Sequence, residues 1–216
     1  LPREQAGPFR SSVVDLDCAR TMSSDFGWKH GVPPKAEIAA APHGGYTLFV
    51  GVAKHPVPWL KSLVRRPYNP VEKAPKNFSE FIRHDWHLTP RDNIPGRDRV
   101  GAVELWNLKN AAFRDLADCS SKNIVLAYEQ ILMRPRWFLK QVGAHLIPVR
   151  KKFVWSLSST KGDDMTFEEY QKKYLTQDIA EGILPDDMAF IRDRIDQELM
   201  KFFGYEWSGT GMRTAD

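Results

Sequence analysis

Two apolar runs, each followed by a helix-forming segment, constrain the fold of this chain more than any other feature. Residues 46–53 are almost continuously apolar and lie between turn-forming residues, and residues 124–128 repeat the pattern. Runs of this kind, without polar alternation, are typical of buried strands in parallel sheets. Pro56 and Pro58 end the first run and lead into a helix at residues 59–64, while the second run precedes a helix over residues 135–146. The sequence therefore predicts an α/β fold with a parallel sheet flanked by helices.

The rest of the chain divides into helical segments and one long connection. Apolar residues recur at helical spacing over residues 102–117. A helical tail begins at Pro185, carries an apolar residue every fourth position, and stops at Gly204. Residues 65–100 are rich in proline and charge and predict an excursion over the surface. Its aromatic residues either line a pocket for a substrate or pack in the core: Tyr68, Phe78, Phe81 and Trp86.

Length, charge and cysteine content favour a single domain over residues 1–216 in a reducing compartment, and we expect a cytoplasmic protein. The 216 residues are 42% hydrophobic and carry a net charge of +4, with both signs mixed along the chain. A nucleic-acid-binding protein usually has a denser basic run, so we expect no nucleic-acid partner. No apolar run approaches the roughly 20 residues of a membrane span. Cys18 and Cys119 lie far apart, without metal-ligand spacing, and are predicted to be free thiols.

Two short segments carry residues suited to group transfer. In Lys29-His30 a cation neighbours an imidazole and would keep it neutral and able to accept a proton, although an exposed loop histidine would have the same sequence. Lys54 closes the first apolar run and Ser62 lies eight residues later in the next helix. A cation at a strand end and a hydroxyl in the following helix can face one phosphate. A solvated lysine and a surface serine are the alternative.

Two further segments give weaker signals. Glu129 follows the second apolar run, where a buried carboxylate is costly unless it is paired, so we expect it to hold loops together rather than react. Lys161-Gly162 lies in a polar loop whose backbone N–H groups can close on a phosphate.

Taken in order, these segments resemble the sulfotransferase superfamily over about residues 26–205. Family members place a histidine in a short Lys-His segment, as at Lys29-His30, and an Arg followed eight positions later by a Ser, which Lys54 and Ser62 match with Lys for Arg. A strand that ends in Tyr-Glu is similar to Tyr128-Glu129, and Lys161-Gly162 partly matches the distal phosphate loop. The ending at residues 203–205, Phe-Gly-Tyr, also resembles bacterial-type members.

The resemblance implies a three-layer, P-loop NTPase-like sulfotransferase fold with a helical C-terminal part. It implies transfer of a sulfuryl group from 3′-phosphoadenosine 5′-phosphosulfate to a hydroxyl of a small molecule, glycan or lipid, which releases adenosine 3′,5′-bisphosphate. His30 would be the general base and Lys29 would neutralise charge. Lys54, Ser62, Lys161 and Gly162 would bind the nucleotide, and no metal is implied.

One family motif is not found. The loop that binds the 5′-phosphosulfate should follow the first strand, but the only candidate, residues 6–12, has no apolar strand before it, and Pro8 removes an N–H group. The chain is therefore either trimmed at its N-terminus or a diverged member. Diverged, it would be an inactive nucleotide-binding or protein-interaction module. A basic nucleic-acid-binding protein and a nucleoside kinase are the less favoured alternatives, since kinases depend on the loop that is not found.

Overall fold

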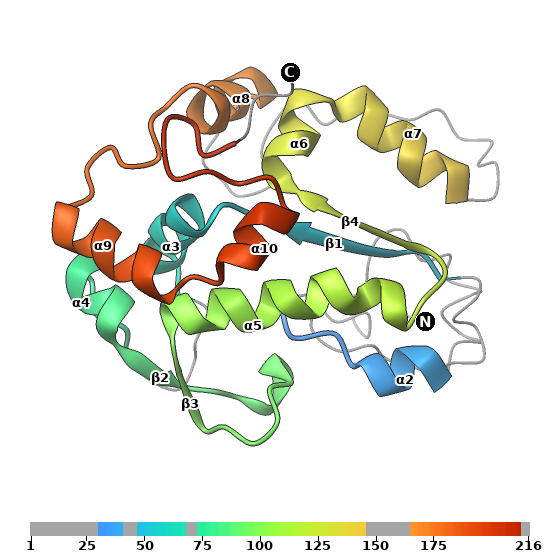
Figure 1. Cartoon of the computed structure of the whole chain (residues 1–216), viewed down its shortest axis with the longest axis horizontal. Coiled ribbons are helices and arrows are strands. Elements are labelled where there is room, and N and C mark those ends of the chain that lie inside the picture. Colours follow the sequence, from blue (N-terminus) through green and yellow to red (C-terminus); the bar gives the residue numbers. More distant parts are fainter. Residues whose placement is uncertain (1–29, 41–46, 68–72, 146–164, 213–216) are drawn as a thin grey trace.

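The computed structural model describes residues 30–40, 47–67, 73–145 and 165–212, which form a mixed α/β structure (Figure 1). Its elements are, in chain order, α2 (Lys35–Ala40), β1 (Phe49–Ala53), α3 (Pro56–Arg65), α4 (Phe78–Arg83), β2 (Asp85–His87), the 3₁₀ turn η3 (Pro90–Asp92), β3 (Arg99–Gly101), α5 (Ala102–Arg114), η4 (Asp115–Asp118), β4 (Asn123–Ala127), α6 (Tyr128–Met133), α7 (Pro135–His145), α8 (Phe167–Leu175), α9 (Pro185–Arg194) and α10 (Gln197–Phe202).

The two predicted strands pair in parallel, as expected. β1 and β4 run in register from Phe49 opposite Asn123 to Ala53 opposite Ala127, with the long helix α5 beside them (Figure 1). Gly51 faces α5 so closely that a Cβ there would lie 3.2 Å from Cβ of Phe113. The sequence predicted a strand that is buried on both faces. Val52, which points to the face opposite Gly51, is 37% exposed, so this part of the prediction is wrong. The described strands form this pair and a separate β2–β3 pair. Among the described residues they do not form the wider sheet on which the predicted three-layer fold would be built.

Residues 73–101 overlap the surface excursion predicted for residues 65–100, but they contain regular secondary structure. They contain α4 and the antiparallel pair β2–β3, in which Trp86 lies opposite Val100. The sequence did not reveal this pair because each strand has only three residues. Phe81 and Trp86 are buried, with their rings in edge contact at 5.3 Å. They are therefore core residues, not the lining of a substrate pocket; Phe78 packs against the same core, and Tyr68 lies outside the described residues.

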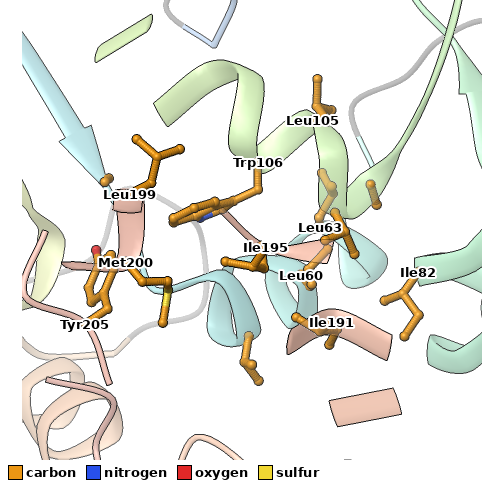
Figure 2. Close-up of a cluster of buried hydrophobic side chains, with 14 of the residues drawn as sticks. Leu60, Leu63, Ile82, Leu105, Trp106, Ile191, Ile195, Leu199, Met200 and Tyr205 are labelled. Atoms are coloured by element: carbon orange, nitrogen blue, oxygen red, sulfur yellow. The ribbon is translucent and has the colours of Figure 1, made fainter. Parts of the chain in front are cut away.

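Trp106 of α5 lies in the middle of the hydrophobic core (Figure 2). Side chains from α3 and from the C-terminal helices surround it, among them Leu60, Leu199 and Met200. The apolar residues that recur at every fourth position of the tail belong to the core, as predicted, since Ile191, Ile195 and Leu199 are all buried. The tail is nevertheless two helices rather than one. Ile195 is extended (ψ 135°), and the side chain of Asp196 caps α10 by accepting hydrogen bonds from the N–H groups of Glu198 and Leu199.

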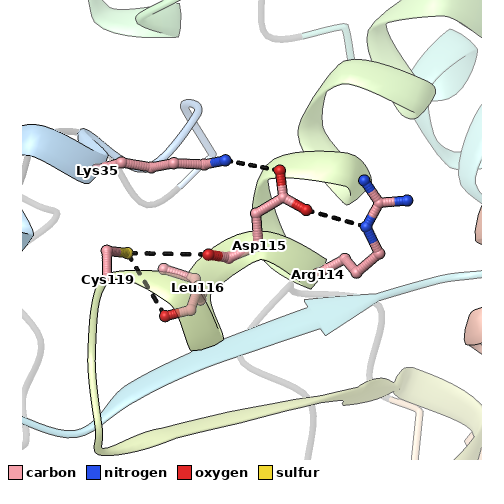
Figure 3. Close-up of polar contacts among 5 residues, drawn as sticks. All are labelled: Lys35, Arg114, Asp115, Leu116 and Cys119. Atoms are coloured by element: carbon pink, nitrogen blue, oxygen red, sulfur yellow. Dashed lines mark hydrogen bonds and ion pairs between the residues drawn. The ribbon is translucent and has the colours of Figure 1, made fainter.

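Polar contacts join α2 to the C-terminal end of α5 (Figure 3). The carboxylate of Asp115 accepts from Lys35 Nζ at 2.6 Å and from Arg114 Nε at 2.9 Å. Partial burial acts to raise the pKa of Asp115, but these two hydrogen bonds hold it below its usual value. Cys119 is a free thiol, as predicted, and its Sγ donates to the carbonyl of Leu116 at 3.4 Å; Cys18 lies outside the described residues.

The segment of residues 205–212, called here the C-terminal strap, folds over the start of α3. Tyr205 and Met212 form an isolated bridge, and the N–H of Ile179 donates to the carbonyl of Gly209. Gly211 has a φ of +77°, and a Cβ at this position would lie 2.7 Å from Cδ2 of His55 and 2.8 Å from Cγ2 of Ile179. Glycine is therefore required at position 211 both by backbone conformation and by space.

We predict that Gly211→Ala destabilises the protein by about 2–4 kcal/mol, because it adds left-handed strain to a steric clash with His55. Urea unfolding followed by tryptophan fluorescence measures the change. Gly209→Ala is the matched control, because Gly209 also has a positive φ (+56°) but nothing within 4 Å of an added Cβ. The control should lose only the backbone contribution of about 1–2 kcal/mol. Equal losses in the two variants would contradict the close packing of the strap on His55.

Candidate functional site

Lys54 and Ser62 meet directly after β1, as the spacing predicted. Lys54 is the first residue after the strand, and Ser62 lies about two turns into α3. Lys54 Nζ donates a hydrogen bond to Ser62 Oγ at 3.0 Å, and Ser62 Oγ donates to the carbonyl of Pro58 at 2.8 Å. The eight-residue separation thus places a cation beside a hydroxyl at the carboxyl end of a parallel strand, where α/β proteins bind ligands.

Aromatic side chains from two helices surround the ammonium group of Lys54. The hydroxyl of Tyr174, on α8, accepts a hydrogen bond from Lys54 Nζ at 2.9 Å. The nitrogen also lies 4.1 Å from the centre of the Tyr174 ring and 5.7 Å from that of Tyr128, which begins α6. The electron-rich faces of these rings attract a cation. Lys54 is therefore held in place by Ser62, Tyr174 and Tyr128 rather than extended into solvent.

A buried carboxylate fixes the backbone beside Lys54. Glu129 is 1% exposed; its two oxygens accept from the N–H of His55 at 3.2 Å and from the hydroxyl of Tyr205 at 3.1 Å. Burial raises the pKa of Glu129, while hydrogen bonds and the nearby charge of Lys54 oppose that rise. The indole N–H of Trp106 also donates to the carbonyl of Lys54 at 2.8 Å. The predicted structural role of Glu129 is thus confirmed, since it joins the ends of β1 and β4 to the strap.

His55 caps the N-terminus of α3 from a fully buried position. Its Nδ1 accepts from the N–H of Val57 at 3.2 Å, and its Nε2 lies 3.0 Å from the carbonyl of Glu206. This pattern assigns the neutral tautomer with the proton on Nε2. Tyr205 and Trp207 make edge contacts with the ring at 5.1 and 5.8 Å. Burial, partly offset by the bond to Glu206, lowers the pKa of His55 to about 4.

His30 lies exposed in a turn just before α2. The segment that follows it is tied to η3, because Val32 donates to the carbonyl of Asp92 at 2.8 Å and accepts from Asn93 Nδ2 at 2.8 Å. Asp92 in turn forms a buried ion pair with Lys109 of α5 at 3.6 Å. Lys109 is one helical turn from Trp106, the residue that binds the carbonyl of Lys54. The convergence of His30 with Lys54 and Ser62 stays a prediction.

Three predicted site residues, Lys29, Lys161 and Gly162, lie outside the described residues. In turn, the structure adds Tyr174, His55 and Tyr205 to the site. His55 was visible in the sequence only as part of the Pro-rich end of an apolar run. Tyr174 and Tyr205 lie far along the chain from Lys54, and no local pattern connects them to it.

The arrangement is suited to binding an anion by one fixed cation and adjacent hydroxyl groups. Each charge-assisted hydrogen bond to such an anion contributes more binding free energy than a hydrogen bond between neutral groups. Within the described residues no group of three or more His, Cys, Asp or Glu side chains is placed to bind a metal ion. In the same residues, no helix combines the length and the apolar character that crossing a bilayer requires.

We predict that burial of neutral His55 makes stability fall in acid. Because the pKa is about 4 in the folded state and 6.5 in the unfolded state, the contribution is complete above pH 6.5 and is lost as the pH falls toward 4. The shift corresponds to about 3 kcal/mol. Urea unfolding at several pH values between about 4 and 7 measures it.

His55→Asn is the control, because asparagine also caps helices but does not titrate. The raised pKa of Glu129 changes stability in the opposite direction, because its contribution to stability is lost as the pH rises. This contribution is present in both proteins. The effect of His55 is therefore the difference in stability between wild type and His55→Asn at each pH. Identical pH profiles for the two proteins would contradict the burial of a neutral imidazole.

No family model, curated protein or solved structure matches this chain.

Proposed function

We propose that this chain is a sulfotransferase that binds a 3′-phosphorylated adenine nucleotide at Lys54 and Ser62. The single observation that carries the proposal is the 3.0 Å contact between these two side chains at the end of a parallel strand. The residues that bind the 3′-phosphate in the resembled family have this separation and this position after a strand. A three-layer arrangement of the complete domain is part of the same proposal.

The residues present fit a phosphate group. Lys54 supplies a positive charge, and its backbone is fixed by Trp106 and by the neighbouring His55–Glu129 bond. Ser62 supplies a hydroxyl on a ten-residue helix whose start is capped by His55. Lysine lacks the fork of N–H groups by which arginine grips two phosphate oxygens at once, so hydroxyl groups around it must provide the direction of binding. Lys161 and Gly162 would complete the phosphate contacts.

In the proposed reaction, His30 removes the proton from the acceptor hydroxyl, whose oxygen forms a bond to sulfur. The bond between sulfur and the oxygen of the 5′-phosphate breaks, and adenosine 3′,5′-bisphosphate leaves with that electron pair. Lys29 offsets the charge that develops on the leaving oxygen. 3′-Phosphoadenosine 5′-phosphosulfate supplies the sulfuryl group, and a hydroxyl of a small molecule, glycan or lipid accepts it.

We predict that the double substitution Lys54→Ala with Ser62→Ala weakens binding of adenosine 3′,5′-bisphosphate at least about 100-fold, because it removes a charged and a neutral hydrogen-bond donor. Isothermal titration calorimetry measures the affinity. Lys201→Ala, which removes an equal charge from an exposed position on α10, is the control and should bind as wild type does. An unchanged affinity in the double variant would remove the nucleotide site from Lys54 and Ser62.

We predict that His30→Ala abolishes sulfuryl transfer but leaves nucleotide affinity within about twofold, because a general base contributes to the reaction rather than to binding. Labelled sulfate transferred to a panel of phenols, sugars and lipids is the measurement. Retained transfer in His30→Ala would exclude this residue as the base. Bisphosphate binding without transfer to any acceptor in wild type would instead support the inactive nucleotide-binding module.

A further inference from the structure

Tyr174 contacts the proposed phosphate site although it lies 120 residues from Lys54 in sequence. Its hydroxyl oxygen lies 2.9 Å from Lys54 Nζ, which is also 3.0 Å from Ser62 Oγ. One nitrogen thus has two hydroxyl neighbours, from α3 and from α8. A phosphate oxygen bound to this ammonium group would lie within reach of both hydroxyls.

The hydroxyls of Ser62 and Tyr174 differ in whether they can donate a hydrogen bond to a ligand without first breaking another one. Ser62 Oγ donates to the carbonyl of Pro58, so it must rotate before it can donate to a ligand. Tyr174 accepts from Lys54, and in the described part of the chain its hydroxyl makes no hydrogen bond as a donor. Accepting a bond from a cation also polarises the phenol and makes its O–H a stronger donor. Tyr174 therefore presents a donor next to the charge.

The ring of Tyr174 is held in position from several sides. Tyr128 contacts it edge-on at 5.4 Å, and Tyr170, one turn earlier on α8, stacks nearly parallel to it at 6.0 Å and 15°. Gln171 of the same helix donates to the carbonyl of Leu132 in α6 at 2.7 Å. Thr166 and Glu169 close the start of α8 with a capping box. The hydroxyl is thus pre-positioned, which lowers the cost of binding a ligand.

We propose that Tyr174 is a third recognition residue of the phosphate site and selects nucleotides that carry a 3′-phosphate. This inference rests on the proposed function. Lys54 contributes a positive charge. The hydroxyls of Ser62 and Tyr174 contribute directional hydrogen bonds, which the fork of N–H groups in an arginine would otherwise provide. Tyr174 donates its hydrogen bond to a phosphate oxygen that Lys54 neutralises, while its own oxygen continues to accept from Lys54.

The test compares two nucleotides that differ only in the 3′-phosphate. Calorimetry gives the affinities of adenosine 3′,5′-bisphosphate and adenosine 5′-monophosphate for wild type, Tyr174→Phe and Tyr170→Phe. Tyr174→Phe keeps the aromatic ring, so its packing against Tyr128 and Tyr170 should persist. We expect it to lose affinity for the bisphosphate by about tenfold or more, the loss typical of one hydrogen bond to a charged group. Its affinity for the monophosphate should not change.

Tyr170→Phe is the matched control, since it removes a hydroxyl from the ring that stacks on Tyr174 and should keep the wild-type selectivity. A selectivity in Tyr174→Phe equal to that of wild type would overturn the role of Tyr174. So would an equal loss of affinity for both nucleotides, which indicates a structural effect. Failure of wild type to bind the bisphosphate at all would instead overturn the proposed function.

Discussion

The buried carboxylate of Glu129 is the interaction on which the geometry of the site depends. Removing a carboxylate from water is costly, and here the cost is offset by the N–H of His55 and the hydroxyl of Tyr205. These partners come from the end of β1 and from the strap, while Glu129 itself follows β4. One side chain therefore fixes three segments relative to one another. Lys54, one residue before His55, takes its position from this arrangement.

The electrostatics around Lys54 follow from the same arrangement. The charge of Glu129 acts on Lys54, and the two tyrosine rings add their negative faces. Each of these groups attracts a cation at this position. A dianionic ligand would approach a lysine whose orientation is already set, so little conformational entropy is lost on binding. A lysine this constrained can contribute to selectivity as well as to affinity.

Sequence patterns predicted the parts of this structure that depend on local periodicity. The apolar runs at β1 and β4, the helices α5 and α7, and the pairing of Lys54 with Ser62 all follow from spacing along the chain. The β2–β3 pair was missed because three residues are too few to show alternation. The break between α9 and α10 does have a local signal, because Asp196 is a good N-cap residue within the apolar repeat. Tyr174 and Tyr205 reach the site only through long-range packing, which no local pattern encodes.

The strap has a consequence for the order in which the protein matures. His55 and Glu206, which are joined by a hydrogen bond, are separated by 151 residues. A ribosome therefore releases the start of α3 long before it has synthesised the segment that covers it. Until then His55 lacks its contact with Glu206, and Glu129 lacks the hydrogen bond from the hydroxyl of Tyr205. The contacts that complete the surroundings of Lys54 can therefore form only after residues 205 and 206 have been synthesised.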